Sequence, residues 1–304
     1  MTAPASRAGT GGARRRVSAF FYRRRKLKLG LLLLPPMGWI LVVYLAALGV
    51  LLLTSLWVQD ELSGRILHTF TLDNFKQLWD DPTNRIITRN TVGMAIVVTI
   101  TDAILAFPLA YYMVRMASPK MRAVLFVGVL MPLWSSYLIK AYTWRLMTAY
   151  DGPINWALGK VGLGPFHIAY SYTAMWLAFS YMWLPYMILP VYAALERVPG
   201  SFLEASSDLG GRAWITFRKV IWPLALPGIA AGSIFTFSLT LGDYVLPDLV
   251  GGNNHDFIGN VIFRFQGVAQ NVPYAAAFAC VPVAIVIVIA YLMLMKRLGA
   301  FEAL

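Results

Sequence analysis

The sequence predicts an all-α membrane protein with six transmembrane helices. The chain has 304 residues, of which 59% are hydrophobic and only 13% are charged, and its mean hydropathy is +0.63. Soluble domains carry roughly 25% charged residues, so most of this surface is expected to contact lipid. Six apolar segments are long enough to span the bilayer core. They lie at about 29–58, 91–114, 122–146, 170–195, 220–247 and 272–295.

Each apolar segment is expected to be helical, because every backbone amide in hydrocarbon must find its hydrogen-bond partner within the protein. Several segments contain prolines, such as Pro108, Pro132 and Pro185. Packed helices tolerate proline with a kink. The sequence therefore predicts a bundle of bent helices that encloses a cavity.

The N-terminus is strongly basic, with nine of the 26 Lys and Arg residues between Arg7 and Lys28. The apolar stretch that follows continues through Val58, too long for a cleavable signal peptide, so a retained anchor is expected. Residues 1–28 are predicted to be a disordered cytoplasmic tail that can lie on anionic lipid. Residues 29–297 form the predicted six-helix domain and 298–304 a short cytoplasmic end. A basic arm for nucleic acid is the disfavoured alternative, because this charge stands beside a membrane segment.

Basic residues also predict the orientation of the spans. If the N-terminal tail is cytoplasmic, eighteen of the 26 basic residues fall on the cytoplasmic side, and most acidic residues fall on the other. Cytoplasmic loops of membrane proteins carry the excess of Lys and Arg. Both termini are therefore predicted to be cytoplasmic.

Residues for catalysis or metal binding are sparse. The single cysteine, Cys280, lies within an apolar run, and the three histidines are far apart in the sequence. There is no phosphate-binding loop of the G-x-x-x-x-G-K-[ST] type and no zinc-protease or serine-nucleophile motif. The sequence therefore predicts that the chain is not an enzyme and holds no cofactor or metal of its own.

The connection between the fourth and fifth spans, Leu195 to Gly228, carries the most specific pattern. Pro199-Gly200 is expected to end the preceding helix, and Ser201 with Glu204 three residues later has the spacing of a capping box. A short helix is predicted from about Phe202 to Leu209. It is expected to stop at Gly210-Gly211, where glycine can adopt the left-handed conformation. A second short amphipathic piece, 214–220, is expected to lead into the fifth span.

This loop resembles the EAA loop of ABC importer permeases, in which Glu-Ala-Ala is followed by a glycine and then by Ile-x-Leu-Pro at fixed spacing. The matching residues are Glu204, Ala205, Gly210 and Pro223. The departures are Ser206 for the second alanine, Val220 for isoleucine and Trp222 for leucine. An ordinary helical hairpin would not need this spacing.

The resemblance implies the type I ABC importer permease fold, with a coupling loop at about 197–219. Its short helix would dock in a cleft of a separate ATPase, which binds ATP and Mg²⁺. The implied ATPase-coupling residues are Glu204, Ala205, Ser206, Asp208 and Gly210. Glu204 would make a polar contact with the ATPase and Gly210 would permit the turn. Asp208 is expected to be a cap or ion-pair partner, with a solvated surface charge as the alternative.

Four further segments narrow the resemblance to the spermidine/putrescine branch of these permeases. They are FTLDNFKQLWDD, MPLWSSYLIKAYTWRLM, LGDYVLPDLVGG and FIGNVI. The branch implies a bacterial inner-membrane location and three kinds of partner: a second and different permease chain, an ATPase dimer at the cytoplasmic face and an extracytoplasmic solute-binding protein. Related branches that import ferric iron, thiamine or opines share parts of these segments and stay open, as does a homodimer.

A pathway for a polyamine should offer carboxylates and aromatic faces to a cation. The candidate pathway residues are Asp243, Tyr244, Asp102, Trp134, Tyr137 and Trp183. For Asp243, with Asp248 just beyond it, a structural hydrogen bond is the alternative. For Asp102 the alternative is pairing with a neighbouring helix, and for the aromatic residues it is packing. Lys140 and Arg145 are expected to extend to the membrane interface.

A stand-alone secondary transporter or channel is the alternative class of function, in which buried carboxylates would serve as ion sites. It would leave the spacing between Glu204 and Pro223 without a purpose, and no inverted repeat is visible.

Overall fold

The computed structural model describes residues 25–60, 63–252, 255–267 and 269–302. The chain separates into two compact units, Met1–Leu53 and Thr54–Leu304. The first unit contains most of helix α2, Arg25–Ser55. Because α2 begins at Arg25, residues 25–28 of the predicted tail are helical; residues 1–24 lie outside the described part of the chain. The apolar stretch Leu32–Ser55 is long enough to cross a membrane, as the sequence predicted.

The second unit contains the remaining elements. Its two short strands, β1 (Val58–Gln59) and β2 (Ile66–Leu67), pair antiparallel with Val58 opposite Leu67. Its helices are α3 (Asp73–Asp80), α4 (Pro82–Arg115), α5 (Pro119–Trp134), α6 (Tyr137–Met147), α7 (Pro153–Lys160), α8 (Tyr172–Glu196), α9 (Gly200–Asp208), α10 (Ala213–Thr216), α11 (Trp222–Gly242), α12 (Ile258–Gly267) and α13 (Val272–Glu302). Two π-helical turns, Phe217–Ile221 and Pro247–Gly251, precede and follow α11. Helix α3 lies within the FTLDNFKQLWDD segment.

Membrane-spanning helices occur where the sequence predicted them, with one change. In the described part of the chain five helices are long and apolar enough to cross a membrane. The pair α5 and α6, bent by 97°, meets the same criteria when the two helices are taken together as one broken span. The sequence predicted a continuous segment at 122–146, but the chain turns at Ser135, which has an extended backbone, and α6 begins only after Ser136. Pro132 lies in the last turn of α5, and its carbonyl oxygen accepts a hydrogen bond from Lys140 Nζ at 2.9 Å. The Ser135 hydroxyl donates to the same oxygen at 2.9 Å, so two side chains satisfy a carbonyl at the end of α5.

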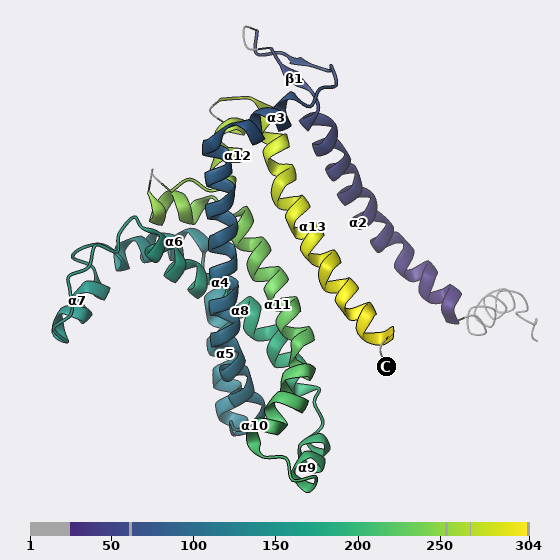
Figure 1. The fold of residues 1–304 in the computed structure, drawn as a ribbon, viewed down its shortest axis with the longest axis vertical. Coiled ribbons are helices and arrows are strands. Elements are labelled where there is room, and N and C mark those ends of the chain that lie inside the picture. Colours follow the sequence, from purple (N-terminus) through teal and green to yellow (C-terminus); the bar gives the residue numbers. More distant parts are fainter. Residues whose placement is uncertain (1–24, 61–62, 253–254, 268, 303–304) are drawn as a thin grey trace, which may run out of the picture. The chain divides into compact units, whose positions relative to one another are not determined.

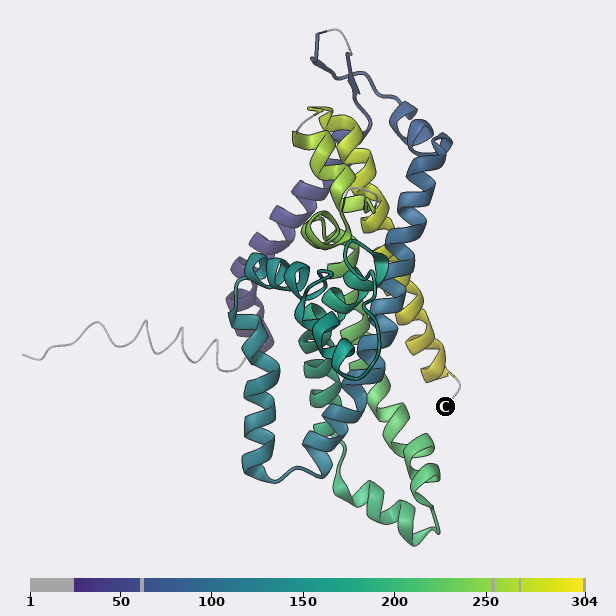
Figure 2. The same cartoon turned by 90° about the vertical axis from the view of Figure 1, so that its left-hand side faces the viewer.

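Three helices, α4, α8 and α11, pack along one another and form the centre of the second unit (Figures 1 and 2). Small residues let them approach closely. A Cβ added at Gly228 of α11 would lie 2.5 Å from the carbonyl oxygen of Pro190 of α8, and one at Gly232 would meet Met187. The buried residues of α8 come from all around the helix, as expected for a central span.

Within the second unit, α9 and α10 lie at one end of these central helices, and α3 and α12 lie at the opposite end (Figures 1 and 2). These ends are called the α9 end and the α12 end. Both predicted functional regions fall at or near an end, so each is described separately below.

Candidate functional site

The helix α9 begins differently from the prediction. Ser201 was expected to be its N-cap, with Glu204 completing a capping box. Instead the helix starts at Gly200, the N-cap is Pro199 with an extended backbone, and no side-chain cap hydrogen bond forms. Proline cannot donate a backbone hydrogen bond and fits well directly before a helix. Ser201 therefore lies inside the first turn, and the predicted capping box is wrong.

The end of α9 matches the prediction. Gly210 has φ +76°, in the left-handed region that favours glycine. The amide of Gly210 donates to the carbonyl of Ser207 at 2.9 Å, and the amide of Gly211 donates to that of Ser206 at 2.8 Å. The Ser206 hydroxyl also lies 2.8 Å from the Thr216 hydroxyl, which ties α9 to α10. Ser206 and Gly210 thus shape the loop itself.

The remaining α9 residues are open to contact. Glu204, Ala205 and Asp208 are exposed, and α9 has no buried residue. Neither acidic side chain forms an ion pair within the described residues, so Asp208 matches the alternative of a solvated surface charge. Large apolar side chains stand beside them, with Leu209 89% exposed and Trp214 68% exposed. An exposed mixture of apolar and acidic groups is typical of a protein-docking surface.

Three of the predicted pathway residues lie together near the end of α11. The carboxylate of Asp243, only 8% exposed, accepts a hydrogen bond from the Tyr137 hydroxyl on one oxygen. Its other oxygen accepts from the amides of Val245 at 2.8 Å and Leu246 at 3.1 Å. The Tyr137 ring stacks on Trp183, with centroids 6.0 Å apart. Asp243 therefore links α6 to the turn after α11, and this geometry matches the structural alternative for Asp243.

The other predicted pathway residues are dispersed. Asp102 on α4 is fully buried, and neither carboxyl oxygen has a hydrogen-bond partner among the described residues. Among the described residues no hydrogen bond or ion pair joins Asp102 to a neighbouring helix, so the expected pairing is not found there. Trp134 is 82% exposed at the end of α5. Tyr244 is 41% exposed and stacks on Phe263 of α12, with centroids 4.7 Å apart.

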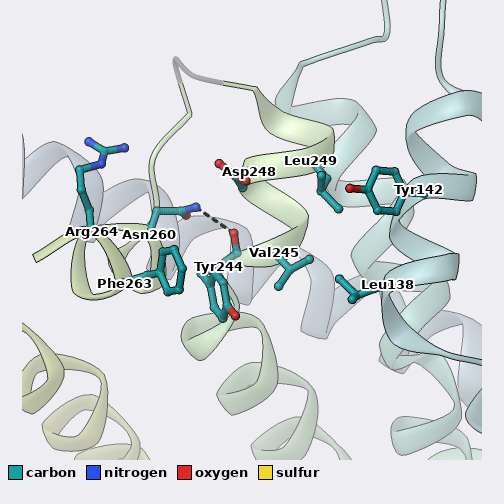
Figure 3. A pocket seen from close by; sticks show the side chains of 9 residues that line it. All are labelled: Leu138, Tyr142, Tyr244, Val245, Asp248, Leu249, Asn260, Phe263 and Arg264. Atoms are coloured by element: carbon teal, nitrogen blue, oxygen red, sulfur yellow. Dashed lines mark hydrogen bonds between the residues drawn. The ribbon is translucent and has the colours of Figure 1, made fainter. Parts of the chain in front are cut away.

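A cleft of about 400 Å³ lies where α6, α12 and the turn after α11 meet (Figure 3). Its lining residues are Leu138, Tyr142, Tyr244, Val245, Asp248, Leu249, Asn260, Phe263 and Arg264. Asn260 Nδ2 donates to the Tyr244 carbonyl oxygen at 2.8 Å and its Oδ1 accepts from the Phe257 amide at 3.1 Å. This asparagine holds α12 against the turn.

Among the lining residues, only Tyr244 was a predicted pathway residue, with Asp248 expected just beyond Asp243. Tyr142, Asn260 and Phe263 were not predicted, because α6 and α12 are far apart in the sequence and come together at the cleft only in the folded chain. The FIGNVI segment contains Asn260 and gave the one available signal. In the described residues no group of three or more histidine, cysteine or acidic side chains is arranged to hold a metal ion.

Residues 123–300 match the family model described as binding-protein-dependent transport system inner membrane component. This match covers more than half of the chain. The chain belongs to this family of ABC importer permeases. The permease is therefore a multi-pass inner-membrane subunit of a binding-protein-dependent importer, and ATP hydrolysis resides in a separate subunit.

Relatives of the permease support the same assignment. It is 47% identical over 312 residues to the inner membrane ABC transporter permease protein YdcU of Escherichia coli K12, covering 98% of this chain and 97% of YdcU. It is 31% identical over 244 residues to the spermidine/putrescine transport system permease protein PotB of the same strain, covering 79% of this chain and 87% of PotB. These matches confirm the predicted resemblance.

A solved structure shows the same fold. A chain of a bacterial alginate ABC transporter, crystallised with an alginate pentasaccharide-bound periplasmic protein, superposes with a TM-score of 0.67 at 17% identity. The match covers 88% of this permease and 93% of that chain. The predicted type I importer permease fold is thereby confirmed.

Proposed function

We propose that this permease forms the solute pathway of a polyamine importer together with a second, different permease chain. The observation that carries the proposal is the similarity to PotB, which extends over 244 residues and is not confined to the family's coupling loop. An extracytoplasmic binding protein would deliver spermidine or putrescine to the permease pair. A cytoplasmic ATPase dimer, which binds ATP and Mg²⁺, would drive the change between outward and inward access.

The geometry of α9 supports its proposed role as the coupling helix. It lies at one end of the central bundle, buries none of its residues and presents Glu204, Ala205 and Asp208 outward. Closure of the ATPase dimer would move α9. The Gly210 turn and the Ser206 contact with Thr216 would pass that movement to α10 and α11.

This role requires the α9 end, and with it both chain termini, to lie in the cytoplasm. Cysteine labelling tests this orientation in a Cys280→Ser background, because Cys280 is the only native cysteine. A membrane-impermeant maleimide applied to intact spheroplasts should modify Asp151→Cys and leave Asp208→Cys unmodified until the membrane is opened. The reverse pattern would contradict the orientation.

The decisive experiment measures solute uptake by the assembled importer in proteoliposomes, with binding protein outside and ATP inside. Labelled spermidine or putrescine should accumulate, and Glu204→Ala should lower ATP-driven uptake by about tenfold, the cost of roughly 1.4 kcal/mol of coupling contact. Glu196→Ala is the matched control, since Glu196 ends α8 and its carboxylate accepts a hydrogen bond from Tyr192 at 3.0 Å.

The outcomes separate the alternatives. Uptake of ferric iron, thiamine or an opine in place of polyamines would keep the mechanism and change the solute. Uptake without ATPase subunits would instead support a stand-alone transporter and overturn the proposal.

A further inference from the structure

The cleft of Figure 3 contains an exposed carboxylate that the structure leaves unpaired. Asp248 is exposed and forms no ion pair within the described residues, in contrast to the buried Asp243. The two arginines nearby have partners of their own. Arg264 pairs with Asp256 at 2.9 Å, and Arg145 donates to the Tyr170 hydroxyl from Nε at 3.2 Å and from Nη2 at 3.1 Å.

Aromatic side chains form the walls around this carboxylate. Tyr244 and Phe263 stack on one side, nearly parallel with an interplanar angle of 11°, and Tyr142 stands on α6 across the cleft (Figure 3). Tyr142 is 51% exposed and Phe263 is 56% exposed, so their faces are accessible to a ligand. Aromatic faces attract cations through the quadrupole of the ring.

The backbone that carries Asp248 is held firmly. Leu246, Pro247 and Val250 around it are buried, the amides of Val245 and Leu246 are bound by Asp243, and Asn260 holds the Tyr244 carbonyl. A carboxylate on a fixed turn loses little entropy when it binds a counter-ion. The cleft is therefore preorganised for a cation.

We propose that this cleft binds a primary ammonium group of an aliphatic amine, with Asp248 as its counter-ion and Tyr142, Tyr244 and Phe263 as its aromatic walls. The inference deepens the proposed function and rests on it for the identity of the solute. Asp248 would supply the negative charge that binds the ammonium group, and Asp243 holds the turn that carries Asp248 through its hydrogen bonds to Val245 and Leu246.

Adjoining pockets indicate the direction of the ligand's carbon chain. A pocket of about 460 Å³ on the other side of Asp248 contains Arg145 and His255, and the positive guanidinium disfavours a second ammonium group there. A pocket of about 530 Å³ shares Leu138, Tyr244 and Val245 with the cleft and has largely apolar walls. The methylene chain would therefore extend along Leu138 toward α11.

Equilibrium binding of labelled putrescine to the assembled importer in lipid nanodiscs, without binding protein, tests the site directly. Asp248→Asn is expected to weaken binding by about tenfold, as expected for removal of a counter-ion contact of roughly 1.4 kcal/mol. Asp248→Glu should retain most of the affinity, and Phe263→Leu should weaken binding to an intermediate degree. Asp151→Asn is the matched control, because it removes one exposed carboxylate outside the cleft.

Several results would overturn the inference. These are binding by Asp248→Asn equal to that of the unaltered importer, no putrescine binding by the unaltered importer, or preferential binding of the anion butyrate, which would assign the cleft to Arg264. Equal thermal stability of the Asp248 variants shows that any loss is local. Uptake with binding protein tests the proposed function separately, since normal polyamine uptake with unaltered binding by Asp248→Asn would overturn only this site.

Discussion

Two regions of the second unit differ in burial and in how far their own residues satisfy their polar groups. The capped turn (Asp243–Gly251) at the end of α11 buries Leu246, Pro247 and Val250, and Asp243 accepts three hydrogen bonds from its own chain. The α9 loop (197–212) has a nine-residue helix with no buried residue, and its helix N-terminus lacks a side-chain cap.

The difference indicates which region is complete by itself. Buried polar groups in folded proteins are nearly always paired, and the capped turn satisfies this rule within one chain. In the α9 loop, exposed apolar residues such as Leu209 and unpaired acidic residues such as Glu204 leave contacts for another protein to make. We infer that the capped turn is a rigid scaffold, and we propose that the α9 loop is an interface.

The largest loss of stability is expected for Asp243→Ala. The substitution leaves the Tyr137 hydroxyl and the amides of Val245 and Leu246 without their acceptor, and a charge-assisted or buried hydrogen bond of this kind is worth about 3 kcal/mol. Thermal unfolding of the purified permease should show this lower free energy of unfolding. Asp248→Ala is the control and should unfold like the unaltered protein. Similar unfolding of both variants would contradict the distinction between the two carboxylates.

A smaller effect is expected for Gly210→Ala. A Cβ is disfavoured at φ +76°, at a cost of about 1 kcal/mol in the left-handed region. Because α9 buries no residue, this cost should weaken the α9 loop and leave the unfolding midpoint of the second unit unchanged. Gly210→Asn tolerates the conformation better and should have about half the effect. Limited proteolysis between Pro199 and Arg212 measures the difference, and equal cleavage of all three proteins would contradict it.

The contrast between these regions also shows what the sequence could predict. The spans followed from apolar length, and the Gly210 turn followed from the conformational freedom of glycine. The break at Ser135 could not be predicted, because no local pattern shows that the side chains of Ser135 and Lys140 bond to the Pro132 carbonyl. The predicted start of α9 was wrong because Ser201 was chosen as the N-cap, whereas Pro199 occupies that position.

The carboxylates show the same limit. Asp243 and Asp248 lie five residues apart in one segment, and the sequence favoured Asp243 as the solute contact. Its partner Tyr137 lies 106 positions earlier in the chain, so the pairing arises only when α6 packs against the capped turn. The cleft itself depends on α12, which Asn260 places, and no local pattern shows that contact.

The smallest effect on stability is expected for Glu204→Ala. Exposed substitutions of this kind usually change the free energy of unfolding by less than about 0.5 kcal/mol, so thermal unfolding should not change. The same variant should nevertheless lower the affinity of the permease for its ATPase subunits, measured by co-purification at increasing salt. A variant that unfolds at a lower temperature would place Glu204 in the scaffold. A variant that retains the ATPase as tightly as the unaltered permease would contradict the contact between Glu204 and the ATPase.

Hydrogen exchange of the permease pair, with and without its ATPase subunits, tests the central claim most directly. Without ATPase, the amides of α9 should exchange much faster than those of Val245 and Leu246 in the capped turn, because few buried contacts protect α9. Addition of the ATPase should slow exchange in α9 by about tenfold or more and leave the capped turn unchanged. Protection of α9 that is already high without ATPase, or that does not change on its addition, would contradict the account.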